Sequence, residues 1–181
     1  CALPILDDQI EMIQQFKTEN AASILEKMDT DDGVDLLEAL LDENKDKAEE
    51  ILSKMLPEDR IELKQLLSYK EDSAGALMTT EYVSIPEKLK VSQAIEYYQK
   101  QRPKESDTAF YLFIVNEVNQ LKGVISIRKL LLEDPQQPVS QIRNNYPIKV
   151  NVDTDQEEVA NVFQKYRSIV LPVVDELDVI L

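Results

Sequence analysis

The side chains of this sequence that are best suited to chemistry are carboxylates on predicted helices. Asp31 and Asp35 are one helical turn apart, so both project from the same helix face. Asp155 and Glu157 stand at the predicted start of another helix. Hard divalent cations bind carboxylate oxygens, take one or two such groups per site and keep part of their water shell. The two pairs are therefore candidate cation ligands.

Acidic residues at the start of a helix also have a structural interpretation. They favour the positive end of the helix dipole, or they cap backbone amides that have no partner within the helix. We adopt this interpretation for Asp32, Glu58 and Asp59, which fall in predicted first turns. For the two candidate pairs, the residues alone leave both interpretations open.

The composition excludes several other functions. The 181 residues include no histidine, which excludes Ser-His-Asp and Cys-His catalysis, and a single cysteine, which excludes a disulfide framework or a thiolate cluster. No catalytic motif accompanies the carboxylates, and we expect no enzymatic activity. The net charge of −15 repels phosphate backbones, so we do not expect nucleic acid as a partner.

The longest apolar runs are too short for a membrane-spanning helix, which needs about 18–20 consecutive apolar residues. The run Ser168–Val174 has the length of a strand. The chain also begins without Met and without a signal-like segment. We therefore expect a fragment of a longer protein whose membrane part lies elsewhere.

Residues 1–70 carry a repeated helical pattern. A shifted copy places Ile24–Met28 on Ile51–Met55 and Asp31–Leu36 on Glu58–Leu63. Each copy predicts one helix, a break, and a second helix opened by acidic residues. Such short helices bury their apolar faces only against neighbouring copies. We predict an all-α, solenoid-like helical-repeat domain over residues 1–70.

From Leu77 onward the pattern changes to short strands that alternate with helices in the order β-α-β-β-α. The predicted elements are Val83–Ile85, Val91–Tyr98, Phe110–Val115, a turn at Asn116–Gln120, Val124–Ile127 and Arg128–Leu132. A second copy runs through Val150–Val152, Gln156–Tyr166 and Ile169–Val174. The whole chain is thus predicted to be an α+β multidomain protein.

The second copy is incomplete. Tyr111–Glu117 aligns with Val170–Glu176, but the first copy then continues into a turn and a strand, whereas Glu176 is followed directly by Leu177–Leu181. We expect a gap after Glu176 in which a strand and turn are missing, and a piece of helix over Leu177–Leu181. The predicted modules cover residues 71–143 and 144–181.

Four segments resemble the cytosolic part of the MgtE-type magnesium transporters and channels, in which a helical N domain precedes two CBS modules. The junction Tyr69–Val83 and the acidic segment Asp153–Ala160 are specific to that family. Leu121–Leu130 and Leu171–Glu176 match it as well, although the Gly-x-x-Ser strand end within Leu121–Leu130 is a general CBS feature. The resemblance covers nearly the whole chain.

The resemblance implies a magnesium-sensing regulatory region at the cytoplasmic face of the cell membrane. In the family, Mg²⁺ bound between the N domain and the CBS modules holds a closed arrangement, and the pore is released when magnesium falls. The expected partners are a second copy, in a homodimer through the CBS modules, and the protein's own transmembrane pore domain.

The resemblance also assigns residues. Asp31, Asp35, Asp155 and Glu157 match acidic metal positions of the family, and so does Asp178 if the chain has a gap after Glu176. Arg167 is a departure, because it stands where family members can carry an acidic ligand and a guanidinium repels a cation.

Two further readings remain. The main alternative is a CBS module that senses adenine nucleotides such as ATP, with Tyr111 stacking on the base and Arg128 contacting phosphate. Lys129 argues against it, because nucleotide-binding CBS modules usually have an acidic residue there to hold the ribose. The third reading is a scaffold whose repeats bind a protein partner.

Overall fold

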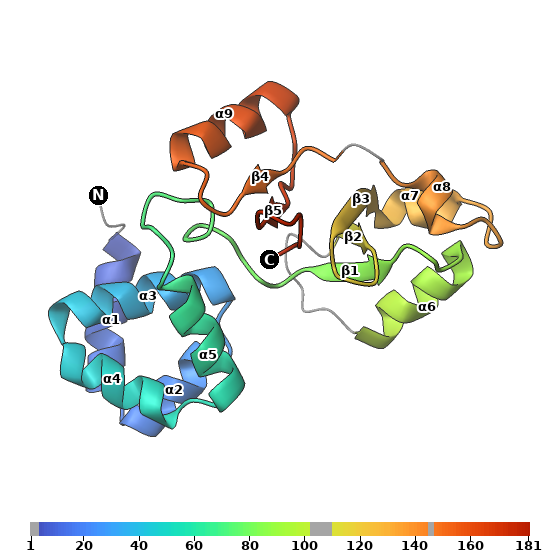
Figure 1. The fold of residues 1–181 in the computed structure, drawn as a ribbon. Helices are drawn as coiled ribbons and strands as arrows, with labels where there is room; N and C mark the ends of the chain where they lie inside the picture. The colour runs from blue at the N-terminus through green and yellow to red at the C-terminus, as the bar shows by residue number, and fades with distance from the viewer. Residues whose placement is uncertain (1–3, 102–109, 145–146) are drawn as a thin grey trace. The chain divides into compact units, whose positions relative to one another are not determined.

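The computed structural model describes residues 4–101, 110–144 and 147–181, and the chain forms two compact units, Cys1–Glu71 and Asp72–Leu181. The first unit is all-α (Figure 1). Its helices are α1 (Pro4–Gln15), α2 (Thr18–Leu25), α3 (Thr30–Glu43), α4 (Lys45–Lys54) and α5 (Pro57–Leu66). The second unit contains the strands. Nine helices and two small sheets in the described residues agree with the predicted α+β architecture.

The first unit encloses an aliphatic core between its helices. Leu37 and Leu40 of α3 and Ile51 of α4 are fully buried. Helix starts are set locally: the Asn44 side chain accepts a hydrogen bond from Lys47 N (3.2 Å) at the start of α4, as an N-cap does. These packed faces hold the outer face of α3, which carries the acids, in a fixed direction.

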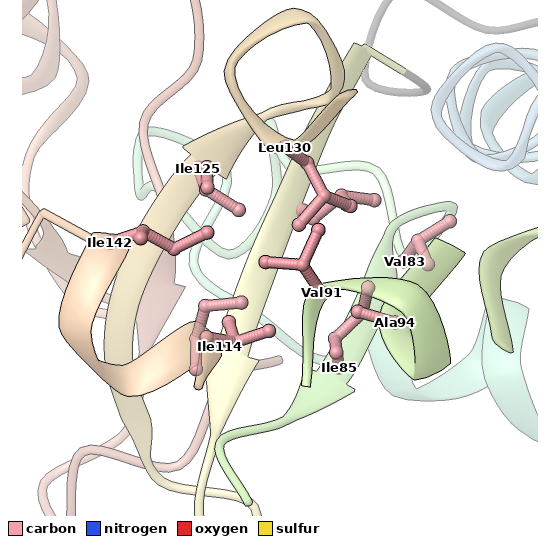
Figure 2. Close-up of a cluster of buried hydrophobic side chains, with 10 residues drawn as sticks. Val83, Ile85, Val91, Ala94, Ile114, Ile125, Leu130 and Ile142 are labelled. Atoms are coloured by element: carbon pink, nitrogen blue, oxygen red, sulfur yellow. The ribbon is translucent and has the colours of Figure 1, made fainter. Parts of the chain in front are cut away.

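Module 1 of the second unit is a three-stranded sheet covered by helices. Its elements are β1 (Val83–Pro86), α6 (Val91–Gln101), β2 (Tyr111–Val115), β3 (Leu121–Ser126), α7 (Ile127–Leu132) and α8 (Val139–Ile142). β1 and β2 are parallel, and β2 and β3 are antiparallel. Figure 2 shows the core that these elements share, which consists of Val83, Ile85, Val91, Ala94, Leu112, Ile114, Ile125, Leu130, Val139 and Ile142.

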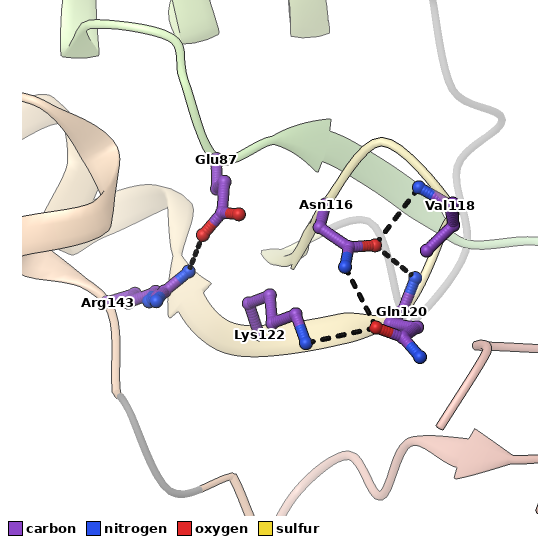
Figure 3. A network of polar contacts seen from close by, with 6 residues as sticks. All are labelled: Glu87, Asn116, Val118, Gln120, Lys122 and Arg143. Carbon is purple, nitrogen blue, oxygen red and sulfur yellow. Dashed lines mark hydrogen bonds and ion pairs between the residues drawn. The ribbon is translucent and has the colours of Figure 1, made fainter. Parts of the chain in front are cut away.

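The linker after α8 covers the outer edge of β3. Asn144 bridges to Val124, and Arg143 forms a partly buried ion pair with Glu87 at 2.7 Å (Figure 3). Gly123 is needed beneath this linker, because a Cβ there would lie 2.6 Å from the Asn144 carbonyl oxygen.

Module 2 repeats the beginning of module 1. β4 (Val150–Asn151) pairs in parallel with β5 (Val173–Val174), and α9 (Gln156–Tyr166) connects the two strands. The start of the unit crosses to this module, since Ala74 N donates to the Thr154 carbonyl (2.7 Å). Figure 1 shows the two modules as separate groups of elements.

The expected gap after Glu176 and the expected helix over Leu177–Leu181 are both wrong. Asp175 begins a tight turn in which its carboxylate accepts from Leu177 N and Val179 N, both at 2.8 Å. Ile180 then bridges back to Val174.

Module 1 has the same turn, which was predicted there. Asn116 Oδ1 accepts from Val118 N (3.1 Å) and Gln120 N (2.9 Å), as Figure 3 shows. The alignment of Glu117 with Glu176 therefore continues without a gap. Short Asx turns are set by one side chain that bonds backbone two residues on, and Asp175 meets that requirement as Asn116 does.

Candidate functional site

Acidic side chains form a row along α3. Asp31, Asp35, Glu38 and Asp42 recur at helical spacing, so they lie along one face. Partial burial, followed by the charges of Asp31 and Asp32, raises the pKa of Asp35 above its ordinary value. Burial first, then the nearby Glu71, Asp35 and Asp42 carboxylates, raises the pKa of Glu38. The charged forms of these two acids are thus disfavoured first by burial and then by the neighbouring negative charges.

This row has the chemistry of a hard-cation site. A divalent cation between carboxylates offsets the repulsion that raises their pKa values, and oxygen donors are its preferred ligands. Asp31 and Asp35 are both exposed, one turn apart, and available for this role. The sequence identified these two residues but missed Glu38, although its spacing from Asp35 was visible in the helical pattern.

Asp155 and Glu157 also lie together, at the start of α9. The Asp155 side chain accepts a hydrogen bond from Glu157 N at 2.9 Å, so Asp155 is the N-cap of this helix. The structural interpretation that was adopted for Asp32, Glu58 and Asp59 thus applies to Asp155. A cap occupies one carboxylate oxygen and leaves the other oxygen accessible to a further ligand.

Asp178 has different surroundings from those expected. It lies in the turn after β5 with a left-handed backbone (φ 65°), and its carboxylate forms an ion pair with the Lys149 ammonium group. The metal assignment of Asp178 depended on a gap after Glu176, and the structure has a continuous tight turn there. An ammonium group beside the carboxylate repels a metal cation.

Over the described ranges 4–101, 110–144 and 147–181, no group of three or more acidic, histidine or cysteine side chains gathers at one point. The candidate metal residues therefore form two local pairs, one on α3 and one at the start of α9, while Asp178 is engaged by lysine.

The candidate nucleotide residues share one open cavity. Tyr111 at the start of β2 and Arg128 on α7 line it, together with Phe110, Ser126, Ile127, Leu131 and Leu132. Lys129 turns away to donate from Nζ to the Ile142 carbonyl at 2.6 Å. Among the described residues, this lining thus offers two aromatic rings and one cation, and no acid for a ribose. Phe110, Leu131 and Leu132 were not foreseen in this cavity.

A second cavity, of about 320 Å³, lies in module 2. Val159 and Phe163 of α9 line it from one side, and Tyr82 and Phe113 of module 1 line it from another. Its walls are apolar and it lacks the convergent polar groups of a ligand site. No helix in the described residues has the length and apolarity to cross a membrane.

Two family models match the chain. The MgtE intracellular N domain matches residues 4–72, and the CBS domain matches residues 74–135. The first match ends one residue after the end of unit 1, and the second lies within unit 2.

Curated relatives are named as magnesium transporters. The magnesium transporter MgtE of Thermus thermophilus is 39% identical over 146 residues, which are 81% of this chain and 32% of that protein. The magnesium transporter MgtE of Bacillus subtilis is 34% identical over 172 residues, or 95% of this chain and 37% of that protein. The chain spans about a third of the length of these two relatives.

Solved structures show the same architecture. One is described as the soluble part of a magnesium transporter; it is 35% identical with a TM-score of 0.89, and the match covers 97% of this chain and 67% of that one. Another is described as the cytosolic domain of the Mg²⁺ channel MgtE in complex with ATP. It has the same identity and TM-score, and the match covers 97% of this chain and 70% of that one.

Proposed function

Because the chain belongs to the MgtE family of magnesium transporters, we propose that it is the regulatory, magnesium-sensing region of such a transporter or channel. Mg²⁺ binds its acidic side chains and, through them, closes the pore when intracellular magnesium is sufficient. The observation that carries this proposal is the row of acids on α3. Asp31 and Asp35 are its ligand candidates, and Asp155 and Glu157 are candidates in module 2.

The physical basis is that burial and charge repulsion disfavour the ionised acids of α3, and that a bound cation offsets this cost. The pKa of Asp35 is raised in the folded protein, so its ionised form destabilises the fold at neutral pH and this penalty disappears as the pH falls below the ordinary carboxyl range. A divalent cation that binds only one conformation stabilises it by RT ln(1 + [L]/Kd), which is about 1.4 kcal/mol at ten times Kd. Several such ions together shift a conformational population decisively.

We further propose that this region acts at the cytoplasmic face of the membrane, on the pore domain of its own protein. The relatives are named as transporters and are about two and a half times as long as this chain. We also propose a homodimer through the CBS modules. Supporting it, Phe110, Leu131 and Leu132 are more than 60% exposed around one cavity. The described residues that line this cavity include no acid, so they add nothing to the repulsion between two chains of charge −15.

The test is a magnesium titration followed by small-angle scattering and thermal unfolding. We expect the wild-type chain to decrease in radius of gyration and to gain thermal stability in millimolar Mg²⁺. Asp31→Asn with Asp35→Asn should abolish both responses and should raise the stability of the magnesium-free chain, because it removes the repulsion on α3.

A matched control changes the net charge equally. Glu58→Gln with Asp59→Asn alters two acids in the first turn of α5, which we interpret as dipole partners, and it should leave the magnesium response intact. Equal dimensions with chelator and with excess Mg²⁺, or a full response in the Asp31/Asp35 variant, would contradict the sensor function of α3.

A second candidate function is adenine-nucleotide sensing. It is favoured by the shared cavity of Tyr111 and Arg128, and one similar structure is described as a complex with ATP. Lys129 stands in place of a ribose-binding acid, so we expect ATP to stabilise the chain less than Mg²⁺ does. A larger melting shift in micromolar ATP than in millimolar Mg²⁺, lost in Tyr111→Ala, would favour the nucleotide function instead.

A further inference from the structure

The turns of the two modules pair with each other with two-fold symmetry. Leu121 N donates to the Asp178 carbonyl (2.8 Å), and Ile180 N donates to the Asn119 carbonyl (3.2 Å). The shift that places Glu117 on Glu176 also places Asn119 on Asp178 and Leu121 on Ile180. The two hydrogen bonds are therefore counterparts, and they join the modules directly.

Each turn is also held by the residue that precedes the first strand of its own module. Tyr82 precedes β1; its side chain lies beside Asn119, and its hydroxyl donates to the Ile180 carbonyl of the other turn (3.3 Å). Lys149 precedes β4, and it forms the ion pair with Asp178. Asn119 and Asp178 both have a left-handed backbone, with φ values of 59° and 65°. The same position thus has a neutral contact in module 1 and a charged contact in module 2.

We propose that the Lys149–Asp178 ion pair is a clasp that holds the turn of module 2 in place for its pairing with module 1, and that Asp178 is a positioning residue and not a metal ligand. This inference does not rest on magnesium binding at α3. It rests on the symmetric hydrogen bonds and on the cation that already occupies the carboxylate.

The surroundings of the clasp fit this role better than they fit a cation site. Asp175, the nearest acid of the turn, uses one carboxylate oxygen to accept from two backbone amides. Lys149 contributes a positive charge where a second metal ligand would have to be negative. The pair is partly exposed, with 33% of the Lys149 and 52% of the Asp178 side chain accessible, so its effect is modest and weakens with salt.

The experiment measures hydrogen exchange of the Leu121 and Ile180 amides, which report the two symmetric hydrogen bonds. Asp178→Asn removes the charge while keeping a residue that tolerates the left-handed backbone, and Lys149→Met keeps the aliphatic stem. Each should speed exchange of both amides by about two- to fivefold. The double variant should exchange no faster than either single variant. In about 1 M salt the wild-type rate should approach that of the variants.

Glu176→Gln is the matched control, because it removes an exposed charge from the same turn, and it should leave both amides unchanged. Millimolar Mg²⁺ should protect these amides equally in wild type and in Asp178→Asn. The proposal is overturned if the single effects add, if Glu176→Gln acts like Asp178→Asn, or if Mg²⁺ protects the amides only when Asp178 is present and more strongly after Lys149→Met.

Discussion

Modules 1 and 2 begin with the same strand, helix and strand, yet their cores differ. In module 1, Val91 and Ala94 of α6 are 1% and 0% exposed because β3 and α7 cover them with Ile125 and Leu130. The counterpart helix α9 of module 2 has no buried residue, and its apolar side chains line an open cavity.

The difference shows which elements close a CBS core. A helix packed on two parallel strands leaves one side of its apolar stripe uncovered, and the third strand and second helix supply the missing contacts. In module 2, the described residues form only one bridge at the position of the third strand, between Val174 and Ile180.

The largest effect is expected from a cavity in the closed core. Leu112 is fully buried in β2, and Leu112→Ala should lower the unfolding free energy of module 1 by about 2–5 kcal/mol. Its counterpart Leu171 is only partly buried, and Leu171→Ala should cost about 1 kcal/mol, because less apolar area returns to water. Amide hydrogen exchange in each module measures both values. Equal losses would mean that the two cores are equally closed.

The second effect tests the linker that covers β3 in module 1. In Gly123→Ala, the new Cβ would lie 2.6 Å from the Asn144 carbonyl and 2.7 Å from Arg143 Cδ. We expect a loss of about 1–3 kcal/mol from this overpacking, measured by urea unfolding. Gly33→Ala on α3 is the control: its nearest contact is 3.7 Å away, and it should stabilise the helix by about 0.5–1 kcal/mol. A neutral Gly123→Ala would show that the linker is not held there.

The third effect compares helix caps. Ser126 accepts from Lys129 N (3.2 Å) at the start of α7, and Asp155 accepts from Glu157 N at the start of α9. Replacement by Ala should cost about 0.5–2 kcal/mol in each case, and more for Asp155, whose charge also favours the helix dipole. Thermal unfolding followed by circular dichroism shows which of the two substitutions lowers the stability more. A larger loss at Ser126 would show that packing outweighs capping in module 1.

The smallest effect concerns an exposed contact of module 1. A hydrogen bond from Lys88, and then its charge, lowers the pKa of Glu117 below the ordinary carboxyl value. The stabilisation is therefore present above the unfolded pKa and is lost as the pH falls through the folded pKa. In an NMR titration, Lys88→Met should move the Glu117 midpoint upward, whereas Lys165→Met should not. Unfolding should be almost unchanged, because both side chains of the pair are exposed.

The sequence predicted the elements that depend on local pattern. The helical N domain followed by a CBS domain, the β-α-β-β-α order and the family are confirmed, because apolar periodicity and turn residues are features of short stretches of chain. Asp31 and Asp35 of α3 were placed on one face for the same reason: an α-helix fixes the direction of residues one turn apart.

Tertiary structure decided which of these side chains already have partners. Lys149 and Asp178 meet because two strands bring their neighbours together, and Lys129 reaches the Ile142 carbonyl because α8 packs beside α7. The prediction after Glu176 failed because the alignment of module 2 with module 1 was not continued into the turn that follows Glu176. Contacts between residues far apart in sequence depend on strand register and helix packing, which no local periodicity records. A carboxylate that looks free in the sequence is therefore a ligand candidate only until the fold shows what lies beside it.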